Sequence, residues 1–343
     1  MPSLSQSWLH RESEFAAFTT GPLLDFWQRR EEGEFIGVDD VPIRFVRLCS
    51  PEHNRVVVIS PGRIESYMKY PEVAYDLFHC GYDVMIIDHR GQGLSGRMLT
   101  DHHRGHVRRF DDYVEDLTRF WQQEIEPRDY VRRFALAHSM GGAVLALMLT
   151  RNPQAFDAVA LCAPMFGIKL PMPLWMAKKV TGWVERRPAM RDSYAIGTGH
   201  WRPLPFIVNA LTHSRPRYRR FLRYYADYPE LRVGGPTYHW VREGIFAGER
   251  AIAGAGKITT PLLLLQAEED RVVVNAAQVA FCQALTHAGH PPYGGEPLVI
   301  QGARHEILFE QDKRRAVALD AIVHFFALHS DSAAEIPANS SRG

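Results

Sequence analysis

Short apolar runs that alternate with helical patterns constrain the fold of this chain more than any other feature. A strand that is apolar on both faces must be covered on both faces, which is the environment of a parallel sheet between two layers of helices. The sequence therefore predicts an α/β fold with a mostly parallel central sheet. The runs that we interpret as strands are residues 55–60, 83–88, 133–137, 158–162, 261–266 and 297–301.

Helical patterns separate these runs, and a last amphipathic helix follows them. We expect the first helix to end at Gly81, and Asp111 or Asp112 to cap the second. The predicted helices cover residues 70–80, about 111–126, 141–150 and about 312–328.

The alternation stops in a segment of different composition. Residues 165–250 show no clear strand, hold 14 aromatic residues and carry 15 Lys/Arg against 6 Asp/Glu, a net charge of +9. The rest of the chain carries 25 and 33, a net of −8, so a basic insert interrupts an acidic body. We predict a core in two parts, residues 1–164 (with an N-terminal extension) and 251–329, a helical basic and aromatic cap at 165–250, and a flexible tail at 330–343.

The composition of the 343 residues excludes several classes of protein. With 46% hydrophobic residues the chain can bury a large core, and a net charge of +1 gives no reason to expect a nucleic-acid partner. The four cysteines are scattered, which favours reduced thiols, and no Cys/His cluster indicates a metal. No signal-peptide pattern and no run of about 18 apolar residues is visible. We therefore expect an intracellular protein, which could still bind a membrane surface.

Residues 134–142 carry the strongest functional signal. An apolar strand runs into Ser139, and Gly141 and Gly142 open the helix that follows. This is the arrangement of a nucleophile elbow, a sharp turn that lifts a serine hydroxyl clear of the sheet and tolerates only small neighbours. Ala137 stands where such motifs usually have their first glycine, and alanine is still small. The alternative is an incidental serine in a strand–helix turn, but the strand before it and the glycines after it favour a nucleophile.

A serine nucleophile needs a base, and the base needs an acid that orients it. In this fold class the order along the chain is serine, acid, histidine, with each residue just past a strand. His305 directly follows the last predicted strand. Glu268, Glu269 and Asp270 follow the strand before it; we favour Asp270 as the acid, with Glu269 as the alternative. His138 adjoins the serine, but adjacent side chains diverge on such a turn.

A tetrahedral oxyanion needs two backbone donors. One is the N–H of Met140, the residue after the nucleophile. The other should come from the turn after the strand that ends at Ser60. Because Pro61 has no N–H, Arg63 or Gly62 must supply it.

Residues 91–96 form a literal G-x-G-x-x-G after a strand, which could indicate a dinucleotide site. That interpretation requires a helix that opens on these glycines, whereas residues 97–103 show no helical apolar stripe. A tight structural loop beneath the active site fits the sequence better.

Five motifs resemble those of monoacylglycerol-lipase-like serine hydrolases of the α/β-hydrolase superfamily, and among these the bacterial inner-membrane lysophospholipases. The likeness extends from about residue 8 to 326, and the stretches 33–46 and 234–242 support the narrower match. The motifs are residues 60–63 (SPGR), 88–95 (DHRGQGLS), 138–142 (HSMGG), 269–272 (EDRV) and 302–306 (GARHE).

The resemblance implies an α/β-hydrolase core, a helical cap inserted after the sixth strand, and no cofactor. The SPGR turn departs from the histidine-glycine start that is common in the wider lipase family. By motif position the resemblance implies a catalytic triad of Ser139, Asp270 and His305, with Met140 and Arg63 as the oxyanion donors.

We therefore expect a serine carboxylic-ester hydrolase that removes the fatty acyl chain of a lysophospholipid through an acyl-enzyme. Because an acyl-enzyme forms, a lipid hydroxyl can replace water, which allows acyl transfer as a side activity. A monoacylglycerol lipase and a general esterase or thioesterase are the alternatives, and the basic insert favours a phosphate-bearing substrate. A non-catalytic binding protein is a further alternative, against which the intact triad argues.

Basic and aromatic residues are interleaved in the predicted cap. Aromatic residues favour the membrane interface, and basic residues are attracted to anionic lipids. We expect peripheral binding to the cytoplasmic face of a bacterial inner membrane; a soluble cytoplasmic protein whose cap presents a solvated helical face is the alternative. One cluster holds Lys178, Lys179, Arg186 and Arg187 with Trp175 and Trp183, and the other holds Arg215, Arg217, Arg219, Arg220 and Arg223 with Tyr218, Phe221, Tyr224 and Tyr225.

Overall fold

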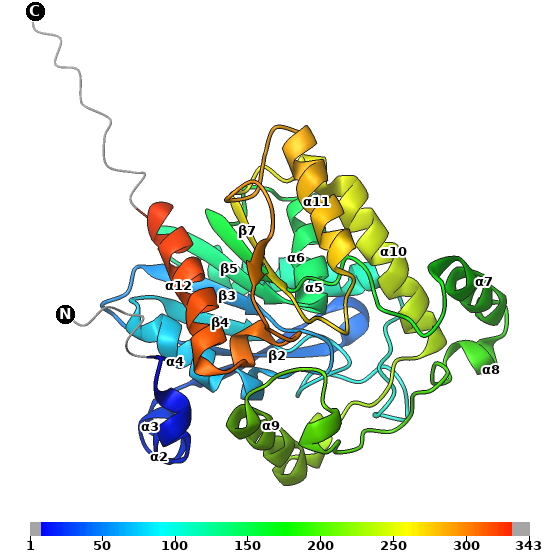
Figure 1. Ribbon diagram of the computed structural model, residues 1–343, viewed down its shortest axis with the longest axis horizontal. Coiled ribbons are helices and arrows are strands. Elements are labelled where there is room, and N and C mark those ends of the chain that lie inside the picture. The colour runs from blue at the N-terminus through cyan, green and yellow to red at the C-terminus, as the bar shows by residue number, and fades with distance from the viewer. Residues whose placement is uncertain (1–7, 331–343) are drawn as a thin grey trace, which may run out of the picture.

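A single twisted sheet lies at the centre of the protein, with helices on both of its faces (Figure 1). The computed structural model describes residues 8–330, so nearly all of the predicted tail at 330–343 lies outside the described residues. Within this range the sheet has eight strands in the order β1-β2-β4-β3-β5-β6-β7-β8. The strands are β1 Glu31–Ile36, β2 Pro42–Leu48, β3 Arg55–Ser60, β4 Asp83–Ile87, β5 Arg132–His138, β6 Ala158–Cys162, β7 Leu262–Ala267 and β8 Leu298–Ile300.

All six strands that the sequence predicts are present. The strands from β3 to β8 pair in parallel, whereas β1 pairs antiparallel with β2, and β2 antiparallel with β4. Strands β4 and β6 are buried at every residue, as their continuous apolar runs predict. The predicted fold class is confirmed: this is a mostly parallel sheet in an α/β-hydrolase arrangement.

The helices form two layers around this sheet. Helices α4 (Pro71–His79) and α12 (Asp312–Leu328) lie on one side in Figure 1, and α5 (Phe110–Phe120), α6 (Met140–Leu149) and α11 (Asn275–His287) lie on the other. Helix α6 is buried along its whole length, which is why its sequence shows no polar stripe.

Helix α5 differs slightly from its prediction. It begins at Phe110, and a π-helical turn at Trp121–Ile125 extends it. Neither Asp111 nor Asp112 is the N-cap residue; the carboxylate of Asp112 instead accepts the backbone N–H of Arg109 (3.3 Å) from a position inside the first turn. A carboxylate at this position satisfies a free backbone N–H at the start of the helix, as an N-cap side chain would.

Helices are inserted between β6 and β7, in the segment of basic and aromatic composition. The predicted cap end at Arg250 falls inside α10 (Tyr238–Gly254), a helix that leaves the cap and packs against α6 and α11. No strand occurs in residues 165–250 of the described chain. The inserted helices before α10 are α7 Leu174–Glu185, α8 Pro188–Arg191 and α9 Arg215–Asp227.

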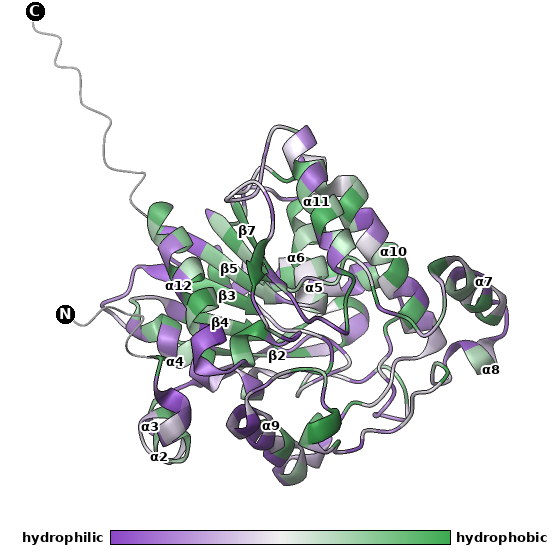
Figure 2. Ribbon diagram, viewed as in Figure 1, coloured by the Kyte–Doolittle hydropathy of each residue, from purple (hydrophilic) through white to green (hydrophobic). Residues whose placement is uncertain are grey.

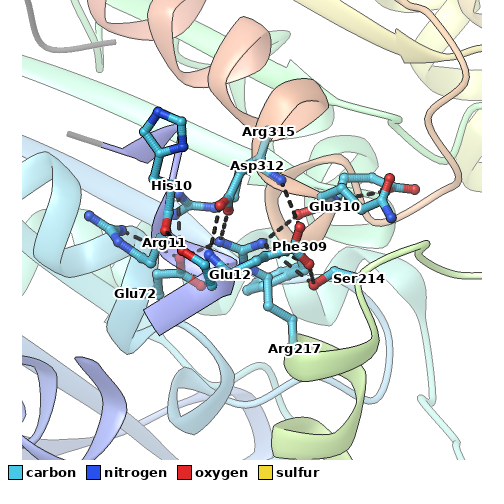
Figure 3. A network of polar contacts seen from close by, with 12 residues as sticks. His10, Arg11, Glu12, Glu72, Ser214, Arg217, Phe309, Glu310, Asp312 and Arg315 are labelled. Carbon is cyan, nitrogen blue, oxygen red and sulfur yellow. Dashed lines mark hydrogen bonds and ion pairs between the residues drawn. The ribbon is translucent and has the colours of Figure 1, made fainter. Parts of the chain in front are cut away.

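A buried network of charges ties α9 to the core (Figure 3). Arg217 of α9 contacts Glu72 of α4 at 2.8 Å and Asp312 of α12 at 2.7 Å. Arg11 of the N-terminal extension contacts Asp76 at 2.7 Å. The extension (3₁₀ helix Arg11–Glu14, then α2 Phe15–Thr20 and α3 Pro22–Trp27) and the cap therefore meet at one buried cluster of charges.

The hydropathy of the residues differs between the central sheet and the cap. Figure 2 shows hydrophobic central strands and a strongly hydrophilic α9. Within residues 8–330 no helix combines the length and the apolar character needed to cross a bilayer.

Candidate active site

Ser139 occupies the turn between β5 and α6 with a backbone conformation that few residues adopt, φ +51° and ψ −117°. The turn is this tight because the helix starts against neighbouring backbone. A Cβ on Gly141 would lie 2.1 Å from the carbonyl oxygen of Ser60, so only glycine fits there. Ala137 pairs with Ser60 and Leu161 in the sheet and is fully buried, so its methyl group fits where such motifs usually have glycine.

The three residues of the predicted triad meet at the carboxyl ends of the strands. The Oγ of Ser139 lies 2.9 Å from Nε2 of His305, and Nδ1 of His305 lies 2.7 Å from Oδ2 of Asp270. All three are buried, with 4%, 4% and 3% of their surfaces exposed. The serine can therefore pass its proton to a histidine whose far nitrogen is held by a carboxylate.

The geometry distinguishes between the candidate acids. Oδ1 of Asp270 accepts the backbone N–H groups of Val272 (2.7 Å) and Val273 (3.0 Å), which fixes the carboxylate toward the imidazole. Burial would raise the pKa of Asp270, but the hydrogen bond and charge of His305 hold it below its usual range. Glu269 is exposed, and its Oε2 lies 3.5 Å from His213.

Glu268 is not in the site either. Its carboxylate accepts the N–H of Gly302 at the surface (2.6 Å).

The structure also distinguishes between Gly62 and Arg63, the two candidates for the second oxyanion donor. The N–H of Gly62 donates to Oε2 of Glu65 at 2.6 Å and is already used. The N–H groups of Arg63 and Met140 have no hydrogen-bond partner among residues 8–330. This pair is therefore free to face a developing oxyanion, the role that the resemblance implies for it.

The G-x-G-x-x-G segment supports this oxyanion turn. The side chain of Gln92 donates to the carbonyls of Gly62 (2.6 Å) and Glu65 (2.8 Å) and accepts the N–H of Ile64 (3.1 Å). No helix opens on these glycines, since the next described helix begins at Phe110. The segment is the structural loop that the sequence predicts, although its sequence did not indicate that Gln92 would fasten the turn.

A buried cluster of charges lies beside the triad, and sequence reasoning missed it. Lys69 contacts Glu65 (2.8 Å) and Glu306 (2.5 Å), and Nδ1 of His138 lies 3.2 Å from Glu65. Burial would raise the pKa of Glu65, but Lys69 and His138 hold it well below the usual range. Nε2 of His138 donates to the carbonyl of His305 (3.1 Å). The cluster thus holds both the turn that contains Arg63 and the segment that contains His305.

Ser139 and His305 open into a cavity of about 350 Å³ between the core and the cap. Most of its lining is apolar and comes from the residues after β6 and from the cap, which suits an acyl chain. Examples are Met165, Ile168, Leu170, Val180, Ile196 and Trp240. Sequence composition indicated an aromatic cap but not which of its residues line the cavity.

Comparison with known proteins agrees with this geometry. Residues 51–312 match the model of the family described as serine aminopeptidase, S33. The chain belongs to this family of serine hydrolases. It is 63% identical to lysophospholipase L2 of Escherichia coli (strain K12) over 325 residues, which cover 95% of this chain and 96% of that protein. A probable lysophospholipase L2 of Haemophilus influenzae is 30% identical over 93% of this chain and 99% of its own length.

Solved structures show the same fold. The monoacylglycerol lipase of Paleococcus ferrophilus superposes with a TM-score of 0.64 at 18% identity, over 84% of this chain and 99% of that one. The resemblance to lysophospholipases and monoacylglycerol lipases inferred from the sequence motifs is therefore confirmed. The chain is a carboxylic-ester hydrolase of the serine type.

Proposed function

We propose that this chain hydrolyses the acyl ester of lysophospholipids. The observation that carries the proposal is the linked series Ser139, His305 and Asp270, which opens into an apolar cavity. The 63% identity to a protein named lysophospholipase L2 supports the choice of substrate.

The reaction begins with attack of the Ser139 hydroxyl oxygen on the acyl carbonyl carbon. His305 takes the hydroxyl proton on Nε2, and Asp270 stabilises the imidazolium that forms. The carbonyl oxygen becomes an oxyanion that accepts the N–H groups of Met140 and Arg63. When the tetrahedral intermediate collapses, His305 protonates the departing glycerol oxygen, and the acyl group stays on the serine.

Water completes the cycle. His305 removes a proton from a water molecule, whose oxygen attacks the acyl-enzyme carbonyl. Collapse of the second intermediate releases the fatty acid and returns the proton to Ser139. A second lipid hydroxyl that enters in place of water would take the acyl chain instead, so acyl transfer belongs to this proposal as a side activity.

The cavity argues against peptide hydrolysis from a free amino terminus. Such a substrate brings an ammonium group, which needs an unpaired carboxylate. Both carboxylates that line the cavity within the described chain, Glu65 and Glu306, already contact Lys69. A lipid ester carries no such requirement.

A hydrolysis panel on the purified protein tests the proposal. The substrates are lysophosphatidylethanolamine, lysophosphatidylcholine, monoacylglycerol and acyl-thioester with one common acyl chain, and released fatty acid is measured. We expect hydrolysis of the lysophospholipids and none by Ser139→Ala, with Ser193→Ala in the cap as the matched control. Cleavage of monoacylglycerol or thioester alone would contradict the proposal, and so would a fluorophosphonate probe that fails to label Ser139.

We also propose that the cap binds the cytoplasmic face of the membrane. Large apolar side chains of the cap are exposed, among them Trp175 (59%) and Trp183 (50%) of α7 and Ile207 (90%). Cations lie over both tryptophans: Lys179 is 5.2 Å from the ring centroid of Trp175, and Arg187 is 3.7 Å from that of Trp183. Apolar surface flanked by cations suits an anionic lipid interface.

The second basic cluster is only partly available for such binding. Arg217 is buried in the charge network, and Tyr218 and Tyr225 are buried too. Phe221 lines the cavity. Three arginines spaced four residues apart remain exposed on α9, namely Arg215, Arg219 and Arg223. Each basic residue close to an anionic surface gains about 1 kcal/mol before screening, enough for reversible binding.

Co-sedimentation of Ser139→Ala protein with vesicles tests the membrane proposal without hydrolysis. We expect binding to phosphatidylglycerol-containing vesicles, little binding to neutral ones, and release by several hundred millimolar salt. Replacement of Trp175 and Trp183 by alanine should weaken binding, whereas Val131→Ala, at an exposed apolar residue outside the cap, should not. Equal binding to both vesicle types at all salt concentrations would refute the electrostatic part.

A further inference from the structure

The side chain of Arg63 lines the cavity beside Ser139, and no carboxylate among residues 8–330 forms an ion pair with it. Its backbone belongs to the oxyanion turn, and its side chain extends beneath the cap, where Nη2 donates to the carbonyl of Gly234 at 2.6 Å. The guanidinium carbon is 5.1 Å from the ring centroid of Trp240. Arg63 and Trp240 line the same cavity as Ser139 and His305.

The arginines whose whole side chains are buried within the described chain, Arg11, Arg90, Arg217 and Arg315, all contact carboxylates. Arg90 contacts Asp116, and Arg217 contacts Glu72 and a second acid. Arg63 forms no ion pair with any residue in the range 8–330, and its buried Nε has no hydrogen-bond partner there. A partly buried guanidinium without a counter-charge is unfavourable, and an incoming anion would offset this cost.

The guanidinium of Arg63 remains protonated in these surroundings. Burial lowers the pKa of its guanidinium to about 10, while the neighbouring phenols of Tyr113 and Tyr225 act in the opposite direction. At neutral pH the side chain is therefore a cation. The two carboxylates of the cavity, Glu65 and Glu306, are engaged by Lys69 and do not compete for it.

The chemistry of a lysophospholipid matches this position. Its acyl ester and its phosphodiester are attached to one glycerol, so the phosphate lies only a few bonds from the carbonyl that the serine attacks. Arg63 offers its backbone N–H at the oxyanion and its side chain within the same cavity. A guanidinium also presents paired N–H donors that fit two phosphate oxygens.

We propose that the Arg63 side chain binds the phosphate of the lysophospholipid and thereby favours phosphate-bearing lipids over monoacylglycerols. This inference rests on the proposed function. One residue then serves the reaction twice, through its N–H at the acyl oxygen and through its guanidinium at the headgroup. Substitution of the side chain leaves the backbone N–H in place, so the two roles can be separated.

The test compares two lipids with the same acyl chain, 1-oleoyl-lysophosphatidylethanolamine and 1-oleoylglycerol, in the same detergent micelles. We expect Arg63→Met to lower kcat/KM for the lysophospholipid roughly 10- to 100-fold, as loss of charge-assisted hydrogen bonds does, mainly through KM. Any loss on oleoylglycerol should be smaller, so that the ratio of the two kcat/KM values falls roughly tenfold or more. Arg63→Lys, which keeps the charge but loses the paired donors, should fall between wild type and Arg63→Met.

Arg97→Met is the matched control. Arg97 also bonds to backbone carbonyls, including that of Glu230 in the cap (2.8 Å), but it does not line the cavity. Its loss should affect both lipids alike. An equal loss on both lipids for Arg63→Met and Arg63→Lys would show that Arg63 only supports the cap, and would overturn the inference.

A second cation in the cavity, Lys169, is the alternative binding partner for the phosphate. Lys169 lines the cavity, is exposed, and donates to the carbonyl of Asp270. A lysophospholipid-specific loss in Lys169→Met but not in Arg63→Met would overturn the inference by placing the phosphate at Lys169. Wild-type protein that cleaves oleoylglycerol and no lysophospholipid would instead refute the proposed function, a result visible before any variant is measured.

Discussion

Replacement of Asp270 by asparagine should disable the enzyme while leaving its fold intact. In the structure Oδ1 of Asp270 accepts two backbone N–H groups, and Oδ2 accepts from Nδ1 of His305 at 2.7 Å. An asparagine can keep the first set of contacts with its carbonyl oxygen. Its amide nitrogen then faces Nδ1 and donates to it, so the histidine must carry its proton on Nε2, the atom 2.9 Å from the Ser139 hydroxyl.

A histidine protonated on Nε2 cannot accept the serine proton, and the imidazolium loses its carboxylate. We expect kcat to fall by a factor on the order of 10⁴, the size of effect that this exchange has in serine proteases. That factor corresponds to about 5.5 kcal/mol of transition-state stabilisation. Glu269→Gln is the matched control: this side chain is exposed and its contact with His213 is 3.5 Å long, so kcat should change by less than about twofold.

Initial rates at saturating lysophospholipid measure both variants, and thermal unfolding shows whether each is folded. The reverse ranking would move the role of the acid to Glu269. Equal, small losses in two folded variants would refute the whole assignment, since neither carboxylate would then orient His305.

Three further outcomes follow from the site and its supports. Ser139→Ala and His305→Ala should each lower kcat by a factor on the order of 10³ or more. The double variant should be scarcely slower than either single one, because the two side chains act as a unit. A double variant whose loss in pre-steady-state assays equals the product of the two single losses would contradict this. Gly141→Ala should destabilise the fold by about 3 kcal/mol or more in urea unfolding, because its Cβ would lie 2.1 Å from the carbonyl oxygen of Ser60; a neutral result would refute the clash. Burial would raise the pKa of Glu72, but nearby arginines lower it below the ordinary 4.5. The ionised Glu72 therefore contributes its full stabilisation above pH 4.5, and this contribution declines progressively as the pH falls below 4.5 toward the lower pKa of the folded state. Glu72→Gln should lower the free energy of unfolding by about 3 kcal/mol at pH 7 and by less at lower pH. A difference in unfolding free energy that does not change with pH would contradict this prediction.

The central strands and the elbow could be predicted because their signals are local. A continuous apolar run needs no knowledge of its neighbours to predict a buried strand, and β4 and β6 are buried at every residue. The edge strand β1 and its neighbour β2 were missed for the opposite reason. In β1, with the sequence EEGEFI, only Phe35 is buried, and in β2 apolar residues alternate with Arg44 and Arg47. These two antiparallel strands are defined by their pairing more than by their composition.

The residues that support the site could not be predicted, because their roles depend on contacts between distant segments. Lys69 and Glu306 are 237 positions apart and meet at 2.5 Å. Gln92 reaches back across 30 positions to the carbonyl of Gly62. Choosing Asp270 over Glu269 likewise required knowing which carboxylate is buried against the histidine. The motifs predict which side chains react, whereas the tertiary structure shows which contacts hold those side chains in place.

The two sides of the cap are attached to the core by interactions of different strength. On α9, Arg217 lies in the buried charge network, and the hydroxyl of Tyr225 donates to the carbonyl of Ile64 in the oxyanion turn (2.7 Å). Removing one partner of a buried pair costs about 3–5 kcal/mol. Displacement of α9 would therefore uncover charges and disturb the oxyanion turn at the same time.

Helix α7 is joined more weakly. Its ion pairs run to α10, from Lys178 to Glu249 and from Glu185 to His239, and the first of these is half exposed. Exposed pairs contribute only about 0–1 kcal/mol each. Separation of the cap from the core therefore costs least on the side of α7, the helix that carries the exposed Trp175 and Trp183. If the cap binds a membrane through these two side chains, as proposed above, the membrane would act on the part of the cap that resists displacement least, while α9 would keep the turn of Arg63 in place.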